Sequence, residues 1–147
     1  MATKCILLAM LVFSLSACSS NAKEGNKRVT LIFPENFRGD VYLVAGGSTD
    51  LKVDKEIEIP VTGVVYLANF KEVELLPRNA FSAKTRSGKV INSSLEVDSV
   101  GPALLWPVGR QEGKIIYFVL GSLDDKIRLS TNKERRWPEI IENLKRR

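Results

Sequence analysis

The sequence predicts a mainly β domain: an antiparallel β-sandwich, immunoglobulin-like or transthyretin-like, with one or two helices at its C-terminal end. Three observations lead to this fold class. From Val29 onward apolar and polar residues alternate, the pattern of strands with one buried face. Gly, Pro, Asn and Ser divide this region into seven or eight short strands. A helical apolar pattern appears only after residue 120, so we expect a single β-rich domain over 29–147 that turns helical at about 122.

The strands follow in order along the chain. The first is predicted over Val29–Phe33, and a turn over 34–39 leads to a second from Asp40 to Ala45. Alternation continues from Leu51 to Ile59, with Lys55 as the exception on the inner face, which fits an edge strand. Arg86-Ser87-Gly88 reads as a hairpin turn. Further strands are expected at Val64–Leu67, Phe81–Thr85, Lys89–Asn92, Leu95–Val97 and Lys114–Leu120.

The C-terminal segment is predicted to be helical. Ser122-Leu123-Asp124-Asp125 resembles a helix N-cap with an acidic first turn, and Thr131-Asn132-Lys133-Glu134 offers a second capping box. Pro138 fits the first turn of a last helix. An apolar stripe on that helix is expected to pack on the sandwich, with contact to a membrane or a partner as the alternative; it consists of Trp137, Ile140, Ile141 and Leu144.

Residues 1–17 have the layout of an export signal: a basic start, a nine-residue apolar run from Cys5 to Phe13, and small residues after it. Spanning a bilayer as a helix takes about 20 residues, so this run is too short to be a lasting anchor. Residues 18–28 are polar without apolar periodicity, so we interpret them as a flexible tether.

Leu15-Ser16-Ala17-Cys18 resembles the lipobox of bacterial lipoproteins. The resemblance implies cleavage before Cys18 and lipid on its sulfur. It further implies a place in the cell envelope, on the periplasmic face of the outer membrane, since Ser19 and not Asp follows the cysteine. Ordinary secretory cleavage after Ser16 is the alternative.

Composition limits the chemistry of the mature chain. It contains no histidine, and Cys18 is its sole cysteine, which excludes serine and cysteine triads and an internal disulfide. No cofactor and no metal site are expected. Residues 126–147 carry a balance of +5 and residues 19–125 one of −1; an exported protein rarely meets nucleic acid, so none is expected as a partner. This basic end is the candidate partner surface, comprising Arg135, Arg136, Trp137, Lys145, Arg146 and Arg147.

For the other candidate sites a structural role is expected. Glu72 and Glu74 have strand spacing and could pair as glycosidase carboxylates, but a solvated strand face is favoured. Asp124 and Asp125 are expected to cap a helix and not to bind a cation. Gly46-Gly47-Ser48 lacks the lysine of a P-loop and is expected to form a turn. Trp106 is expected in the core, with an exposed ligand-binding aromatic as the alternative.

Three short segments resemble a family of small bacterial proteins of unknown function, many of them lipoproteins. Phe33-Pro34-Glu35-Asn36-Phe37-Arg38-Gly39 is similar to its I-P-E-G-[FY]-x-G signature, with Asn36 where the family prefers glycine. Asparagine tolerates positive φ next best, so the turn is retained. Ile59–Val64 and Tyr117–Gly121 fit two later elements. The resemblance brings no catalytic residue and no ligand.

These observations favour a non-enzymatic envelope module, anchored through Cys18, that binds a protein or polymer; an immunity lipoprotein against a secreted toxin is one form. An accessory subunit of an envelope assembly, docked through the last helix, is the structural alternative. A carboxylate-based hydrolase of cell-wall glycans is the enzymatic one, and it would require two carboxylates about 5–9.5 Å apart across a cleft.

Overall fold

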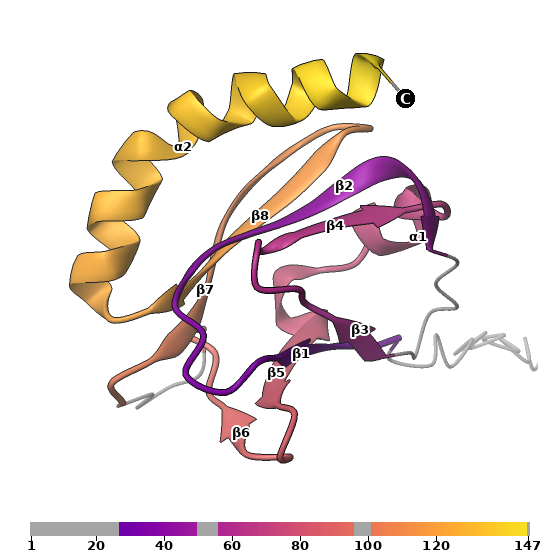
Figure 1. Cartoon of the computed structure of the whole chain (residues 1–147). Helices are drawn as coiled ribbons and strands as arrows, with labels where there is room; N and C mark the ends of the chain where they lie inside the picture. The colour runs from indigo at the N-terminus through magenta and orange to yellow at the C-terminus, as the bar shows by residue number, and fades with distance from the viewer. Residues whose placement is uncertain (1–26, 50–55, 96–100, 147) are drawn as a thin grey trace, which may run out of the picture.

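The computed structural model describes residues 27–49, 56–95 and 101–146. Two four-stranded sheets pack face to face, and a long helix, α2 (Leu123–Lys145), covers the outer face of the second sheet (Figure 1). The signal, the lipobox and residues 18–26 of the tether lie outside the described residues. No helix in the described part of the chain is long and apolar enough to cross a bilayer.

The first sheet has the order β3-β1-β5-β6. Its central strand β1 (Val29–Phe33) runs parallel to β3 (Glu56–Glu58) and to β5 (Phe81–Thr85). The hairpin turn predicted at 86–88 is confirmed, because β6 (Val90–Ile91) pairs antiparallel with β5. β3 is an edge strand, as predicted, but residues 51–55 of the predicted strand, including Lys55, lie outside the described residues.

The second sheet has the order β4-β2-β8-β7. Strand β2 (Gly39–Thr49) lies between β4 (Val64–Leu67), which is parallel to it, and β8 (Ile115–Gly121), which is antiparallel. β7 (Leu104–Gln111) pairs antiparallel with β8 and forms an edge. β7 was not predicted because Pro107 argues against a strand; its register shift between Pro107 and Gly109 at an edge accommodates the proline.

The sandwich is mixed, so the antiparallel prediction was wrong. The prediction assumed that consecutive strands pair as hairpins. Instead, the chain crosses from one sheet to the other after each of its first four strands, so β1, β3 and β5 share the first sheet and β2 and β4 share the second. Each crossing reverses the chain, and two crossings return it to the same sheet in the original direction. Two strands of one sheet that are separated by two crossings are therefore parallel.

Two apolar clusters lie on the two sides of the second sheet. Val41 and Leu43 of β2 face the first sheet, whereas Tyr42 and Val44 face α2. Every residue of β8 is buried, since the first sheet covers one of its faces and α2 the other. This position explains the continuous apolar run at 115–120.

Helix α2 is one continuous helix of 23 residues, not two. Its predicted N-cap is confirmed: the Ser122 side chain accepts from Asp125 N, and the Asp125 carboxylate accepts from Ser122 N. The second capping box was wrong, because Thr131 lies inside the helix and its hydroxyl donates to the Arg128 carbonyl. Pro138 also lies inside and lacks the N–H that would bond to the Glu134 carbonyl. The helix bends along the sheet (Figure 1), and an internal proline is a common cause of such a bend.

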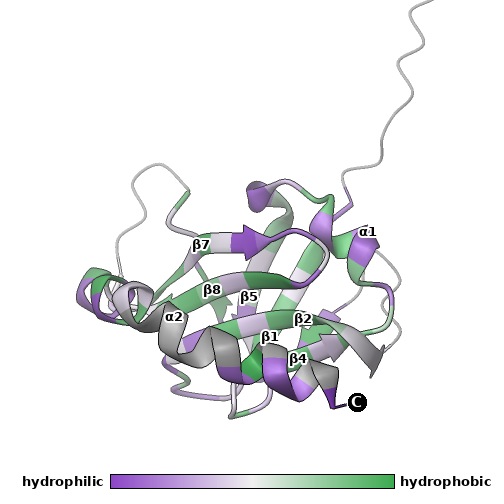
Figure 2. Ribbon diagram, turned by 90° about the horizontal axis from the view of Figure 1, so that it is seen from above, coloured by the Kyte–Doolittle hydropathy of each residue, from purple (hydrophilic) through white to green (hydrophobic). Residues whose placement is uncertain are grey.

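Packing of α2 on the second sheet agrees with the prediction for the apolar stripe. Ile140 is 5% exposed and joins Tyr42, Tyr117 and Val119 in one cluster, with Leu129 packed beside it. Figure 2 shows α2 lying across strands of this sheet. The side chains of Trp137, Ile141 and Leu144 lie outside the description.

Candidate functional site

The three segments that resemble a family signature meet at one end of the molecule. β1 ends at Phe33, the turn over 34–39 begins β2, and β2 lies beside the Pro60–Gly63 turn and the last residues of β8. We call this region the motif end, defined by the turns 34–39 and 60–63 and by the first turn of α2. The opposite end, where β1 begins, is the tether end.

The turn over 34–39 is held by its own backbone and by a neighbouring hairpin. Phe37 N donates to the Pro34 carbonyl at 3.2 Å, and Asn36 has φ 59°, the positive value predicted for the family's glycine position. The Glu35 carboxylate accepts from Ser87 N at 2.9 Å. This backbone hydrogen bond, together with the Ser87 hydroxyl, lowers the pKa of Glu35 below its ordinary value.

Two glycines allow close approaches at the motif end. Gly63 has φ 72°, and a Cβ there would lie 2.0 Å from the Asp40 carbonyl oxygen. Its own carbonyl accepts from Tyr42 N at 2.7 Å, which joins the Pro60–Gly63 turn to β2. Gly121 precedes the helix cap, and a Cβ there would lie 2.7 Å from the Asp125 carboxylate. Close packing therefore explains glycine at these two positions.

A buried polar pair lies beneath this region. The Tyr117 hydroxyl donates to Asp40 Oδ1 at 2.9 Å, and both residues are buried. The Tyr117 ring stacks on Tyr42, with ring centroids 4.9 Å apart. Asp40, near the start of β2, is thus buried as the hydrogen-bond partner of Tyr117, which α2 covers.

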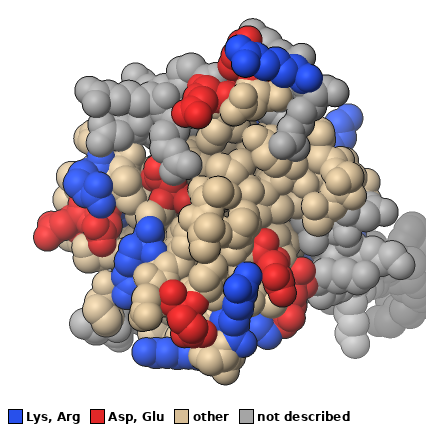
Figure 3. Space-filling model, in the orientation of Figure 1, with Lys and Arg blue, Asp and Glu red and all other residues tan. Residues whose placement is uncertain are grey.

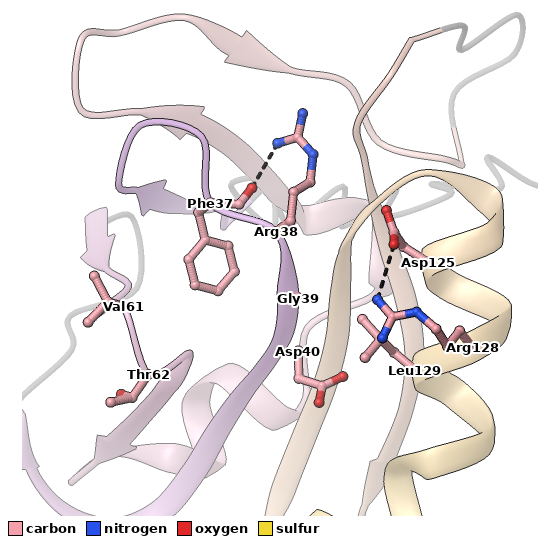
Figure 4. Close-up of a pocket in the computed structure, with 9 residues that line it drawn as sticks. All are labelled: Phe37, Arg38, Gly39, Asp40, Val61, Thr62, Asp125, Arg128 and Leu129. Atoms are coloured by element: carbon pink, nitrogen blue, oxygen red, sulfur yellow. Dashed lines mark hydrogen bonds and ion pairs between the residues drawn. The ribbon is translucent and has the colours of Figure 1, made fainter.

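A cavity of about 290 Å³ opens between the two turns and α2. Figure 4 shows Phe37, Val61 and Thr62 along one side and Asp125, Arg128 and Leu129 along the other. Arg128 Nη2 lies 3.2 Å from Asp125 Oδ1. The lining combines apolar surface with charged side chains of both signs.

A second hollow of about 250 Å³ lies on the other side of the turn 34–39, between the two sheets. Phe37 and Arg38 line both hollows, so the turn separates them. Val90, Ile91 and Leu104 contribute apolar surface to the second hollow. The motif end thus has a hollow on each side of the turn 34–39.

Comparisons with known proteins give one structural match. A solved structure described as a "Putative Lipoprotein from Bacillus anthracis" superposes with a TM-score of 0.47 and 11% sequence identity, covering 82% of this chain and 96% of that chain. A likeness at this level carries no functional argument. No protein-family model and no curated protein matches the sequence.

The carboxylates Glu72 and Glu74 do not lie on a strand, as their spacing had suggested. They belong to α1 (Phe70–Glu74), where residues two apart point about 200° from one another around the axis. Glu72 is exposed, and the Glu74 carboxylate accepts from Gly113 N. The buried residues Phe70 and Val73 explain the helix, since they are three apart on one face.

Asp125 caps α2, as predicted, and the capping hydrogen bonds have an electrostatic consequence. The Ser122 N–H, then the Ser122 hydroxyl and Arg128, hold the pKa of Asp125 below its ordinary value of 3.8. In the described residues no group of three potential metal-ligating side chains comes together.

Gly46-Gly47-Ser48 is not a turn but part of β2. A Cβ at Gly47 would lie 2.1 Å from the Tyr66 carbonyl oxygen, and the register of β2 with β4 shifts between Ala45 and Thr49. These glycines therefore allow a bulge and close strand approach. Trp106 is partly buried against the α2 cluster, and its indole N–H donates to the Gly121 carbonyl at 2.9 Å.

Most side chains of the predicted partner surface lie outside the part of the chain that the structure describes. The side chains of Arg135, Arg136, Trp137 and Lys145, and all of Arg147, lie outside the description. Arg146 is exposed, with its Nε 3.7 Å from the Glu142 carboxylate. On the face seen in Figure 3, described charges of both signs are interspersed around an uncharged centre.

Sequence reasoning missed the cavity at the motif end, including Arg38, Val61 and Arg128. Arg38 and Val61 lie inside the segments that carry the family resemblance, which was the available signal. Arg128 comes from α2, and its proximity depends on how the helix packs.

Proposed function

We propose that this chain is a lipid-anchored lipoprotein of the cell envelope whose β domain is a non-enzymatic binding module. The observation that carries the proposal is Leu15-Ser16-Ala17-Cys18, which follows an apolar run of signal-peptide length and precedes a polar segment leading to β1. Ser19 after the cysteine supports the outer membrane as the destination, where the domain would face the periplasm.

Replacing Cys18 by alanine tests the anchor. We expect the Cys18→Ala protein to leave the membrane fraction, since the polar tether offers no other apolar anchor and lipid contributes about 0.8 kcal/mol per buried CH₂. Fractionation and mass measurement of the mature protein are the readouts. Cys5→Ala is the matched control, because Cys5 lies in the signal and is removed. A Cys18→Ala protein that stays in the pellet after high-salt washing would contradict the proposal.

The motif end is the surface we assign to the partner. Strand β1 carries the chain from the tether end to the turn at 34, about 16 Å away for five residues, so this end is directed away from the anchored lipid. Among the exposed large apolar side chains of the described residues, Val61, Val90, Leu123 and Ile127 lie at this end. Exposed apolar groups beside a concave surface are typical of protein contact sites.

A photo-crosslinking residue at Val61 tests this assignment in intact cells. The expected result is one discrete crosslinked product, with none from the same residue at Ser82 on the outer face of the first sheet. An adjacent toxin gene whose product crosslinks would identify an immunity lipoprotein. Crosslinks to a large envelope complex would favour the accessory-subunit role, and equal products from both positions would argue against a site at Val61.

A further inference from the structure

The tether joins the domain beside α1 and the turn that follows it. Val29, the first residue of β1, is in register with Phe81, and Phe81 directly follows the 3₁₀ turn over Arg78–Ala80. Residues 27 and 28 therefore enter next to that turn. In Figures 1 and 2 the start of the described chain and α1 lie on the same side of the molecule.

Leu75 projects from this side in a firmly held segment. It is 84% exposed, although its neighbour Leu76 is buried. The Arg110 guanidinium donates to the carbonyl oxygens of Glu74, at 2.6 Å, and of Leu76, at 3.3 Å. The Glu74 carboxylate also accepts from Gly113 N. Because both flanking residues are tied to the edge of the second sheet, Leu75 is presented outward.

Exposed basic residues lie on both sides of Leu75 in the sequence. Lys71 lies one helical turn before it and Arg78 three residues after it, and both are exposed, as are Lys27 and Arg28 at the domain's entry. Glu72 is an exposed acidic residue of α1, and Glu112, next to the Gly113 whose N–H binds Glu74, is exposed as well. We call Lys71, Leu75 and Arg78 the tether-side patch.

We propose that the tether-side patch rests on the anionic headgroups of the membrane that holds the Cys18 lipid. This inference depends on the proposed lipid anchor. Ten residues, the length of 19–28, reach at most about 33 Å even when fully extended, so the tether end stays within that distance of the bilayer. Each basic side chain near an anionic surface favours docking by about fivefold, and an exposed leucine among them can enter the interfacial layer.

Spin labels on the mature lipidated protein test the docking. Cys18 is the sole cysteine of the mature chain and its sulfur carries the lipid, so Leu75→Cys and Val61→Cys each accept one label. Val61 is the matched control, because it is 80% exposed and lies at the motif end. In vesicles of phosphatidylglycerol and phosphatidylcholine, the label at 75 should lose collisions with a water-soluble nickel complex and gain them with oxygen, while the label at 61 does not change.

Charge reversal separates the headgroup contact from simple proximity. Lys71→Glu with Arg78→Glu should lower the docking equilibrium constant by at least about 25-fold, the loss of two basic residues alone, whereas Arg86→Glu with Lys89→Glu, in the β5–β6 turn, should leave it unchanged. Melting curves confirm that each variant is folded. Equal water access at positions 75 and 61 in anionic vesicles would overturn the inference, as would spin–spin broadening from a second copy. If the Cys18→Ala protein still pelleted with membranes, the proposed lipid anchor would be refuted. If the lipidated protein pelleted but the label at position 75 stayed exposed to water, only the proposed docking would be refuted.

Discussion

Gly63 and Gly113 have nearly the same backbone conformation in different surroundings, with φ 72° and 67°. A Cβ at Gly113 would have nothing within 4 Å, whereas one at Gly63 would lie 2.0 Å from the Asp40 carbonyl oxygen. The pair therefore separates the cost of left-handed backbone from the cost of a steric clash.

We expect Gly113→Ala to lower the free energy of unfolding by about 1–2 kcal/mol, the cost of positive φ for an alanine. Gly63→Ala should lower it by a further 1–3 kcal/mol or so, because β2 and the Pro60–Gly63 turn must separate. Urea unfolding of both variants measures the difference. If both variants lost the same free energy of unfolding, β2 and the Pro60–Gly63 turn would be able to move apart at little cost to accommodate the added methyl group.

At the scale of the element, the N-terminus of α2 has a pH-dependent stability. The folded pKa of Asp125 is below its unfolded value, so ionised Asp125 stabilises the fold above about pH 3.8, and this contribution is lost as the pH falls through the folded pKa. We expect Asp125→Asn to be less stable than the wild type at pH 7 and the difference to shrink below pH 3.8. Thermal unfolding between pH 2.5 and 7 is the measurement.

Asp124→Asn is the control for that series, since it leaves the hydrogen bonds between Ser122 and Asp125 in place. Its stability difference from the wild type should vary less with pH. If both variants followed the same curve, the general charge of the first turn, and not the capping box, would be responsible.

The C-terminal half of α2 is predicted to contribute to stability through Ile140. Ile140→Ala should lower the free energy of unfolding by about 2–4 kcal/mol, the range for truncating a buried isoleucine. Asn143→Ala, one turn nearer the exposed C-terminal end of α2, should leave it unchanged or slightly raise it, since Asn143 is exposed and alanine favours helix. A small effect of Ile140→Ala would mean that this half of the helix is loosely held.

At the scale of the whole molecule, the proposal of a non-enzymatic module makes a prediction of its own. The soluble domain from Asn26 onward is expected to lack hydrolytic activity and stoichiometric transition metal, because the mature chain has no histidine and no free thiol. Elemental analysis and peptidoglycan turnover are the measurements. Turnover abolished by Glu72→Gln or Glu74→Gln, or one zinc or iron per chain, would reverse it.

Local pattern was sufficient for many elements. Val29–Phe33 alternates because one face is buried, and Ser122 begins α2 because its hydroxyl satisfies a free N–H. Asn36 takes the positive φ that its place in the turn predicts. Each of these features depends on residues a few positions apart, so the sequence by itself determined them.

Only the tertiary structure decided which strands pair, how far α2 extends and what surrounds the motif end. Hydrophobic alternation says that a strand has a buried face but not which neighbour covers it, so it could not distinguish a hairpin from a crossing between sheets. Packing on the second sheet makes α2 continuous through Pro138, which the local pattern had placed in the first turn of a separate helix. The cavity likewise joins residues 37, 61 and 128, which are distant in sequence and come together because both sides of β2 and β8 are covered.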